Sequence, residues 1–220
     1  MNKYWLPVAG IAASIAAIAY CNTPEPSAVA QPVPAGLENL GPMSYRYEVK
    51  GDTFMIYAKG YISYNEAVAF NEFRKSWENL PTKGIKRVAL SINSYGGSIA
   101  GAADMAEWVK DNKVETLVTN GEYCVSACVL VWGAGYHKWA SETAKIGVHN
   151  ASAMGGPEAD REAGEAEGTI FMAKALAKEG APASIVGALT MTDKKDVHWL
   201  KAGDAAAWGA TMVDTNGKPL

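Results

Sequence analysis

Near residue 50, apolar and polar residues alternate along two neighbouring stretches of the chain. The stretches cover residues 45–49 and 53–59, and Lys50-Gly51-Asp52 lies between them. Alternation with a period of two is typical of a strand that buries one face, and a glycine beside an aspartate is typical of a tight turn. The pattern predicts a β-hairpin over residues 45–59.

After this hairpin, short apolar runs alternate with stretches in which apolar residues recur at helical spacing. The apolar runs predict strands at residues 86–93, 114–119 and 144–149. The helical spacing predicts helices at 65–77, 100–110, 127–132, 157–178, 181–189 and 205–208. Strands that alternate with helices indicate an α/β domain with parallel pairing, and such domains carry their chemistry at strand ends.

The first thirty residues have a different pattern, dominated by one long apolar run. Lys3 precedes an uncharged run over residues 5–20, and a polar, proline-rich stretch follows at 22–27. The run is shorter than the ~20 residues that a membrane-spanning helix needs, which favours a secretory signal peptide over residues 1–30. Ala28-Val29-Ala30 fits the cleavage pattern, so we expect cleavage after Ala30 and export to the periplasm or cell envelope.

Two alternatives keep the chain at a membrane. An uncleaved N-terminal segment would serve as an anchor, and Cys21 would carry a lipid in a lipoprotein, although Tyr20 replaces the usual small residue before it. Membrane contact is expected only in these two cases. Residues 31–43 are rich in proline and glycine and predict a linker, and residues 44–220 then form a single α/β domain.

The composition fits one globular domain and excludes some classes of function. Of the 220 residues, 49% are hydrophobic, which suffices for a sizeable core. The net charge is -3 and both signs are spread along the chain, so we predict no nucleic-acid partner. The sequence has no zinc-like spacing of cysteine and histidine, and we predict no metal and no cofactor.

The cysteines fall on both sides of the predicted cleavage point. Cleavage removes Cys21 and leaves Cys124 and Cys128, an even pair that predicts a disulfide in an oxidising compartment. At this spacing on a regular helix, the Cα separation approaches the upper end of the bridgeable range. The alternative is a pair of small thiols packed in the core.

Ser126 lies between an apolar strand and an apolar helical stretch, with a cysteine on each side. At a helix N-terminus, the oriented N–H groups and the helix dipole stabilise a developing oxyanion. Gly96-Gly97 also follows a strand and precedes a helix, and paired glycines let the backbone adopt positive φ and approach a ligand. The alternatives are an ordinary helix cap for Ser126 and a tight turn without a ligand for the glycines.

A nucleophilic serine needs a base, and a carboxylate usually orients that base. His149 closes an apolar strand, where a core or capping histidine is the alternative. His198 also stays open as a base, whereas His137 lies in a predicted exposed loop. Asp193 and Asp196 are the candidate carboxylates, with solvated loop acids or a helix cap as the alternative.

Over about residues 86–214, these motifs together resemble those of the ClpP/crotonase superfamily. In the Clp protease proteolytic subunit a strand ends in Asn-Ser-Pro-Gly-Gly-Ser, and Asn93-Ser-Tyr-Gly-Gly-Ser98 is similar except at Tyr95. The subunit's nucleophile follows a Gly-x-Ala-Ala-Ser turn, and Gly121-Glu-Tyr-Cys-Val-Ser126 is similar but one residue longer. Counting back without gaps from Trp208-Gly209, in the family's terminal signature, places Asp193 on the family's aspartate.

The resemblance implies a fold and a set of roles. The fold is α/β, a ClpP/crotonase-like spiral of β-β-α units with a mostly parallel sheet. Ser126 would be the nucleophile, His149 the general base and Asp193 the orienting acid, with Asp196 as the alternative to Asp193. The N–H groups of Gly97 and Ala127 would form the oxyanion hole.

One departure from the family leaves a second nucleophile open. An alignment without gaps from Trp132-Gly-Ala-Gly135 places Cys124, rather than Ser126, on the family's nucleophile. We favour Ser126, because a cysteine in a disulfide cannot attack. Gly155-Gly-Pro and an acidic helix replace the segment that the Clp subunit uses between rings, so barrel assembly is not carried over and a homo-oligomer stays open.

The leading prediction is an exported serine hydrolase, a peptidase that cuts a peptide or protein substrate through an acyl-enzyme. Crotonase-like acyl-CoA chemistry is the alternative within the superfamily, and export argues against it because CoA thioesters are chiefly intracellular. A catalytically silent module that binds peptides or an envelope partner is the alternative from another class.

Overall fold

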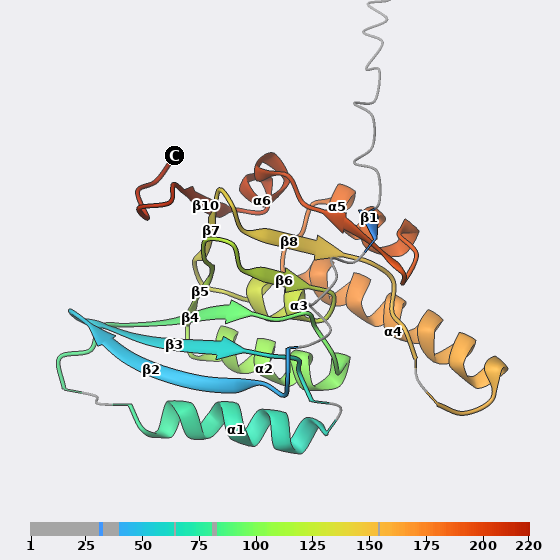
Figure 1. The fold of residues 1–220 in the computed structure, drawn as a ribbon, viewed down its shortest axis with the longest axis horizontal. Coiled ribbons are helices and arrows are strands. Elements are labelled where there is room, and N and C mark those ends of the chain that lie inside the picture. The colour runs from blue at the N-terminus through green and yellow to red at the C-terminus, as the bar shows by residue number, and fades with distance from the viewer. Residues whose placement is uncertain (1–30, 33–39, 64, 81–82, 154) are drawn as a thin grey trace, which may run out of the picture.

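The computed structural model describes residues 31–32, 40–63, 65–80, 83–153 and 155–220 (Figure 1). The predicted signal peptide, its cleavage point and the alternative anchor all lie outside the described residues, as does most of the predicted linker. Within the described ranges, no helix is both long enough and apolar enough to cross a membrane.

Six strands form the larger sheet, in the order β10-β7-β5-β4-β3-β2 (Figure 1). Strand β2 pairs antiparallel with β3 as the predicted hairpin, and the remaining pairs are parallel. The strands are β2 (Ser44–Lys50), β3 (Thr53–Lys59), β4 (Arg87–Asn93), β5 (Glu115–Val118), β7 (Lys138–Ser141) and β10 (Ala210–Val213). The sheet confirms the predicted α/β class with mostly parallel pairing.

A second, four-stranded sheet has the order β1-β9-β8-β6. Its strands are β1 (Gln31–Pro32), β6 (Tyr123–Val125), β8 (Lys145–Val148) and β9 (Asp196–Trp199). Strands β6 and β8 run parallel, and β9 runs antiparallel to β8. An isolated bridge between Ser94 and Cys124 joins the end of β4 to β6. The two sheets therefore meet where β4 ends.

Helices follow most strands, and each predicted helix is present with ends that shift by a few residues. They are α1 (Glu66–Glu78), α2 (Ile99–Asp111), α3 (Cys128–Gly133), α4 (Glu158–Lys178), α5 (Ala183–Met191) and α6 (Ala202–Ala207). Helices α1 and α2 lie side by side along the larger sheet, and the N-terminal end of α4 extends away from the body of the molecule (Figure 1).

Helix α3 is the centre of the core. Each of its residues is buried, as expected for a helix that is apolar on every side. Trp132 meets Trp208 edge to face, with ring centroids 5.3 Å apart. Gly133 makes this contact possible, because a Cβ there would lie 2.6 Å from the Trp208 ring. The helix is thereby fixed, and the turn that precedes it is fixed with it.

Five short strands, β1, β6, β7, β9 and β10, were not predicted, and β1 corrects the predicted linker at residues 31–32. Each has two to four residues, which is too short for a period of two to show in the sequence. The second sheet is therefore a finding of the structure. It matters for function because β6 leads directly to Ser126.

Candidate active site

Ser126 occupies a sharp turn between β6 and α3. Its φ is 58°, the left-handed region that costs a residue with a Cβ about 1–2 kcal/mol. The residue that caps α3 is Ala127, and no side chain caps this helix. The helix-cap interpretation of Ser126 is therefore wrong. Strained backbone of this kind clusters at functional sites, where the surrounding structure enforces it.

A disulfide brackets this serine turn, by which we mean Ser126 and Ala127. It joins Cys124 in β6 to Cys128 at the start of α3, with Cα atoms 5.3 Å apart. Both cysteines are fully buried. The predicted disulfide is confirmed, and in this oxidised form Cys124 has no thiolate with which to attack.

The glycine turn, Gly96 and Gly97, lies directly against the serine turn. Gly96 has a φ of 95°, and a Cβ there would lie 2.8 Å from Ser126 Cβ and 3.1 Å from the Ala127 nitrogen. A residue with a side chain does not fit in this space. The sequence motif suggested a ligand-binding turn. The structure gives a steric reason for glycine at position 96: the backbone there lies in contact with the candidate nucleophile.

Two N–H groups at this junction have no acceptor among the described residues. They are those of Gly97 and Ala127, the pair predicted to form the oxyanion hole. The glycine turn is held from its other side by Ile62, whose N–H donates to the Gly96 oxygen at 2.7 Å and whose oxygen accepts from Ser98 N–H at 3.1 Å. Fixed, unpaired N–H groups are what an oxyanion site requires.

His149 follows β8, the parallel neighbour of β6. In this pair Val125 lies opposite Gly147, and the Ser126 N–H donates to the Gly147 oxygen at 3.0 Å. Because parallel strands end at the same edge of a sheet, Ser126 and His149 leave their strands side by side. The topology thus brings the predicted nucleophile and base to one edge.

The ring of His149 is buried, with 6% of the residue exposed. Burial lowers the pKa of His149 below its ordinary value of 6.5, and the Asn150 carbonyl and the Asp193 charge offset part of this shift. His149 Nδ1 lies 2.7 Å from the Asn150 oxygen. A carbonyl oxygen only accepts, so Nδ1 carries the proton and Nε2 has the free lone pair of a base.

Within the described part of the chain, neither the Ser126 hydroxyl nor His149 Nε2 has a hydrogen-bond partner. The two groups are therefore not hydrogen-bonded to each other in this structure. In sites without substrate, catalytic hydrogen bonds are often long and tighten when substrate binds.

The candidate carboxylates differ in their relation to His149. Asp193 lies in the exposed loop after α5, where its carboxylate accepts from the Lys195 N–H at 2.9 Å, and its charge acts on His149. Asp196 instead begins β9 and pairs with Pro32. The hydrogen bond of His149 Nδ1 goes to a main-chain oxygen, so neither carboxylate holds the position that an orienting acid takes in a triad.

Comparisons with known proteins place this geometry in a fold family. No protein-family model matches the chain, and no curated protein does. Among solved structures, a ClpP1 mutant from Listeria monocytogenes is similar with a TM-score of 0.55 and 16% identity, over 74% of this chain and 92% of that chain. A membrane-bound stomatin-specific protease is similar with a TM-score of 0.53 and 14% identity, over 73% and 77%.

An enoyl-CoA hydratase from Mycobacterium avium subsp. paratuberculosis is similar with a TM-score of 0.50 and 14% identity, over 78% of this chain and 69% of that chain. The chain has the ClpP/crotonase fold. The predicted fold is thereby confirmed. Since ClpP/crotonase structures include proteases and acyl-CoA enzymes, the fold leaves the chemistry of this chain to be argued from its site.

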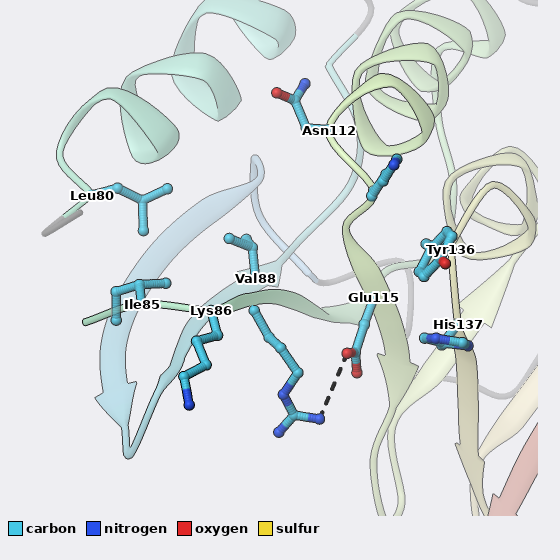
Figure 2. Close-up of a pocket in the computed structure, with 10 residues that line it drawn as sticks. Leu80, Ile85, Lys86, Val88, Asn112, Glu115, Tyr136 and His137 are labelled. Atoms are coloured by element: carbon cyan, nitrogen blue, oxygen red, sulfur yellow. Dashed lines mark ion pairs between the residues drawn. The ribbon is translucent and has the colours of Figure 1, made fainter. Parts of the chain in front are cut away.

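The other two histidines of this ClpP/crotonase domain lie elsewhere. His137 lines a cavity of about 640 Å³ at the edge where β4 and β5 begin, beside the Arg87–Glu115 ion pair (Figure 2). Ser126 lies where strands end, so His137 is not its base. His198 is half-buried in β9, opposite Val148.

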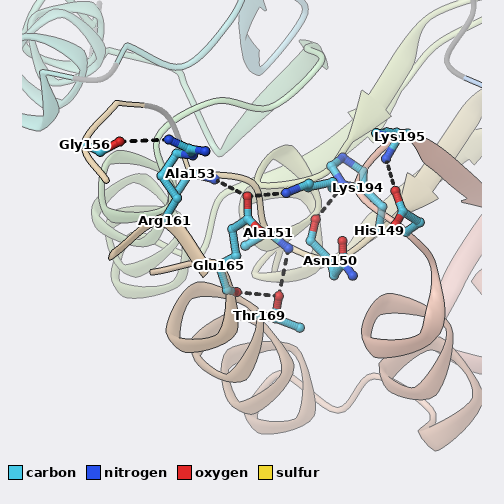
Figure 3. Close-up of polar contacts among 11 residues, drawn as sticks. His149, Asn150, Ala151, Ala153, Gly156, Arg161, Glu165, Thr169, Lys194 and Lys195 are labelled. Atoms are coloured by element: carbon cyan, nitrogen blue, oxygen red, sulfur yellow. Dashed lines mark hydrogen bonds and ion pairs between the residues drawn. The ribbon is translucent and has the colours of Figure 1, made fainter. Parts of the chain in front are cut away.

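One part of the site carried no signal in the sequence. The chain after His149 is tied to α4 and to the loop before β9 by a set of polar contacts (Figure 3). Their members are Ala151, Ala153, Glu165, Thr169 and Lys194. Main-chain groups supply several of these contacts, and a main-chain group has no residue type by which a sequence could reveal it.

Proposed function

We propose that the chain is a serine hydrolase, a peptidase of the ClpP-like type that works through an acyl-enzyme. One observation carries the proposal: the enforced left-handed backbone at Ser126 sets this serine against the glycine turn, at the edge where His149 has a free Nε2. The substrate class is a peptide or an unfolded protein segment.

The geometry supports a complete acyl-transfer cycle. Ser126 Oγ attacks the carbonyl carbon of the scissile peptide bond, and its proton passes to His149 Nε2. The N–H groups of Gly97 and Ala127 bind the oxyanion. The C–N bond then breaks and His149 gives its proton to the leaving amine. Water, activated by His149, cleaves the ester and returns the proton to Ser126.

The structural neighbours support an enzyme of this fold but divide over the reaction. One is named as ClpP1, one as a stomatin-specific protease and one as an enoyl-CoA hydratase. The left-handed serine favours the protease reaction. Acyl-CoA chemistry uses paired N–H groups for an enolate and gives no role to a strained hydroxyl between them.

A catalytically silent module that binds peptides is the second candidate. The observation that favours it is the lack of a hydrogen bond between the Ser126 hydroxyl and His149 within the described residues. Such a module would use the same N–H groups to hold a peptide carbonyl without cutting the chain.

Labelling with a fluorophosphonate probe separates the two candidates. We expect the oxidised protein to be labelled, Ser126→Ala to abolish labelling, and His149→Ala to slow it by about 10²-fold or more. The matched control is His198→Ala, which should label at the wild-type rate. Because burial lowers the pKa of His149, the labelling rate should fall on acidification with a midpoint below pH 6.5.

Two outcomes would overturn the hydrolase. Folded, oxidised protein that is not labelled at any pH would favour the binding module. If His198→Ala lost labelling and His149→Ala kept it, the base would instead be His198 in β9.

We also propose that the protein acts after export, in the periplasm or cell envelope. The support is the Cys124–Cys128 disulfide, since structural disulfides persist chiefly in oxidising compartments. An exported peptidase would meet its substrates without the cytosolic machinery that feeds the Clp chamber.

A further inference from the structure

The orientation of His149 depends on one main-chain carbonyl. We propose that the Asn150 carbonyl, rather than a carboxylate, orients His149, and that Thr169 in α4 is the residue that positions this carbonyl. The inference rests on the proposed function and names further residues for the same reaction.

The first support is the hydrogen bond itself. His149 Nδ1 lies 2.7 Å from the Asn150 oxygen, at the short end of the ordinary range for a nitrogen donor. It fixes the proton on Nδ1 and leaves Nε2 free. In a triad, this is what the carboxylate does. Here the Asp193 carboxylate accepts instead from the Lys195 N–H.

The second support is the way the peptide group is held. The Asn150 carbonyl and the Ala151 N–H belong to one planar, trans peptide and point in opposite directions. The Ala151 N–H donates to Thr169 Oγ1 at 2.8 Å, so this bond sets the direction of the carbonyl on the far side. The N–H of Asn150, which belongs to the preceding peptide group, donates to the Thr192 oxygen at 3.0 Å and holds Asn150 on the other side of its Cα.

Thr169 is itself held in place. Its hydroxyl donates to the Glu165 main-chain oxygen at 2.8 Å, one turn earlier in α4, which turns its lone pairs toward Ala151 (Figure 3). The Glu165 carboxylate accepts from the Ala153 N–H at 3.2 Å and from Lys194. The same helix turn thus holds the segment after His149 and the loop that carries Asp193.

The hydrogen bonds form a chain from α4 to the base. They run from Thr169 to the Ala151 N–H and from the Asn150 carbonyl to His149 Nδ1. A peptide whose N–H is engaged is a better acceptor at its carbonyl, because such bonds polarise one another. Thr169 touches no reacting atom and is a positioning residue.

The test compares Thr169→Val with Thr169→Ser. Valine keeps the shape of threonine but removes the acceptor, whereas serine keeps the hydroxyl. We expect Thr169→Val to lower kcat for fluorogenic peptide cleavage about ten-fold at unchanged KM, and Thr169→Ser to retain most of the activity. Asp193→Asn should lower kcat less than Thr169→Val, since its charge reaches His149 only through space.

A spectroscopic readout keeps the test independent of activity. In protein with ¹⁵N-labelled histidine, the nitrogen shifts report the tautomer of His149, assigned by comparison with His149→Gln. We expect the Nδ1–H tautomer in wild type and in Thr169→Ser, and a mixture of tautomers in Thr169→Val. The thermal melt of each variant shows that it is folded, and Thr169→Ala, which also removes the acceptor, replaces the valine variant if that variant does not fold.

The proposal is overturned if Thr169→Val keeps both the wild-type tautomer and the wild-type kcat, while Asp193→Asn loses them. Failure of the proposed function looks different: the wild type would then cleave no peptide and take no probe. Even in that case the tautomer measurement decides whether Thr169 positions His149.

Discussion

Gly96 and Ser126 show how a single missing side chain defines the site. Ser126 adopts a strained backbone that its neighbours must enforce, and Gly96 is the neighbour whose lack of a Cβ leaves the space. The sequence pointed to both residues, because a glycine pair after a strand and a serine before an apolar helix are visible as letters. The contact between the two turns was not visible in the sequence, since the whole of residues 98–125 separates them.

Gly96→Ala tests this contact. The new Cβ would lie 2.8 Å from Ser126 Cβ and 2.8 Å from the Val125 oxygen, at a φ of 95°. We expect probe labelling of Ser126 to slow at least about ten-fold and the free energy of unfolding to fall by about 1–3 kcal/mol. Labelling kinetics and urea denaturation measure the two effects.

Gly209→Ala is the matched control for that variant. Gly209 also has a positive φ, 79°, but no atom lies within 4 Å of its Cβ position. It should cost about 1 kcal/mol of stability from strain alone and leave labelling unchanged. Equal labelling of the two variants would show that the contact at Gly96 does not position Ser126.

The role of Asn150 marks the limit of prediction at this scale. A histidine and two aspartates in the right order suggested a triad, and the structure shows His149 bonded to a carbonyl instead. Any residue has a carbonyl at that position. The choice between a carboxylate and the main chain therefore depends on how the peptide is held, which short-range sequence patterns do not encode.

At the scale of elements, β6, the serine turn and α3 act as one unit. The disulfide joins the strand to the helix across the turn, and α3 is fixed in turn by Trp132 and Trp208. The helix and the cysteine pair were predictable from an apolar run and an even count. Strand β6 was not, because its pairing with β8 comes from distant residues and it has only three of its own.

Reduction of the disulfide should loosen this unit. A bridge that closes so short a loop stabilises a fold by about 2 kcal/mol. We therefore expect the free energy of unfolding of the oxidised protein to be higher than that of the double variant Cys124→Ala/Cys128→Ala by about 2 kcal/mol. Labelling of Ser126 should be slower in the reduced protein than in the oxidised one. Urea denaturation and probe kinetics, each with and without reductant, measure this.

The thiol assay checks the assignment of the nucleophile at the same time. Iodoacetamide should not modify Cys124 or Cys128 without reductant, since both are bonded and buried. Rapid modification of Cys124 in untreated protein would contradict the disulfide and return that cysteine as a candidate nucleophile.

At the scale of the whole molecule, the fold was the most predictable feature. The alternation of strands and helices indicated the α/β class correctly. The glycine turn follows β4 of the larger sheet and His149 follows β8 of the smaller one, and the two sheets meet through the bridge between Ser94 and Cys124. The division into two sheets was not predictable, because it depends on the short strands β6 and β9 and on where β6 meets β4.

Export also belongs to this scale. When the protein is expressed with residues 1–30, we expect to recover it outside the cytoplasm. Its intact mass should correspond to a chain that begins at Gln31 and carries a closed disulfide. Ala30→Trp, which disrupts the small-residue cleavage pattern, is the control and should retain the full length at the membrane. Recovery of wild type at full length in the membrane would instead support the anchor.

The shortest strand has a consequence for how the molecule meets its neighbours. Strand β1 pairs with β9 through Gln31 and Pro32 and so becomes the border of the smaller sheet. A border strand with free N–H groups invites another chain to add to the sheet, which is how many proteins aggregate. Proline has no N–H to offer, and two residues are too few to template a further strand. The segment that starts the described fold therefore also closes its sheet against unwanted partners.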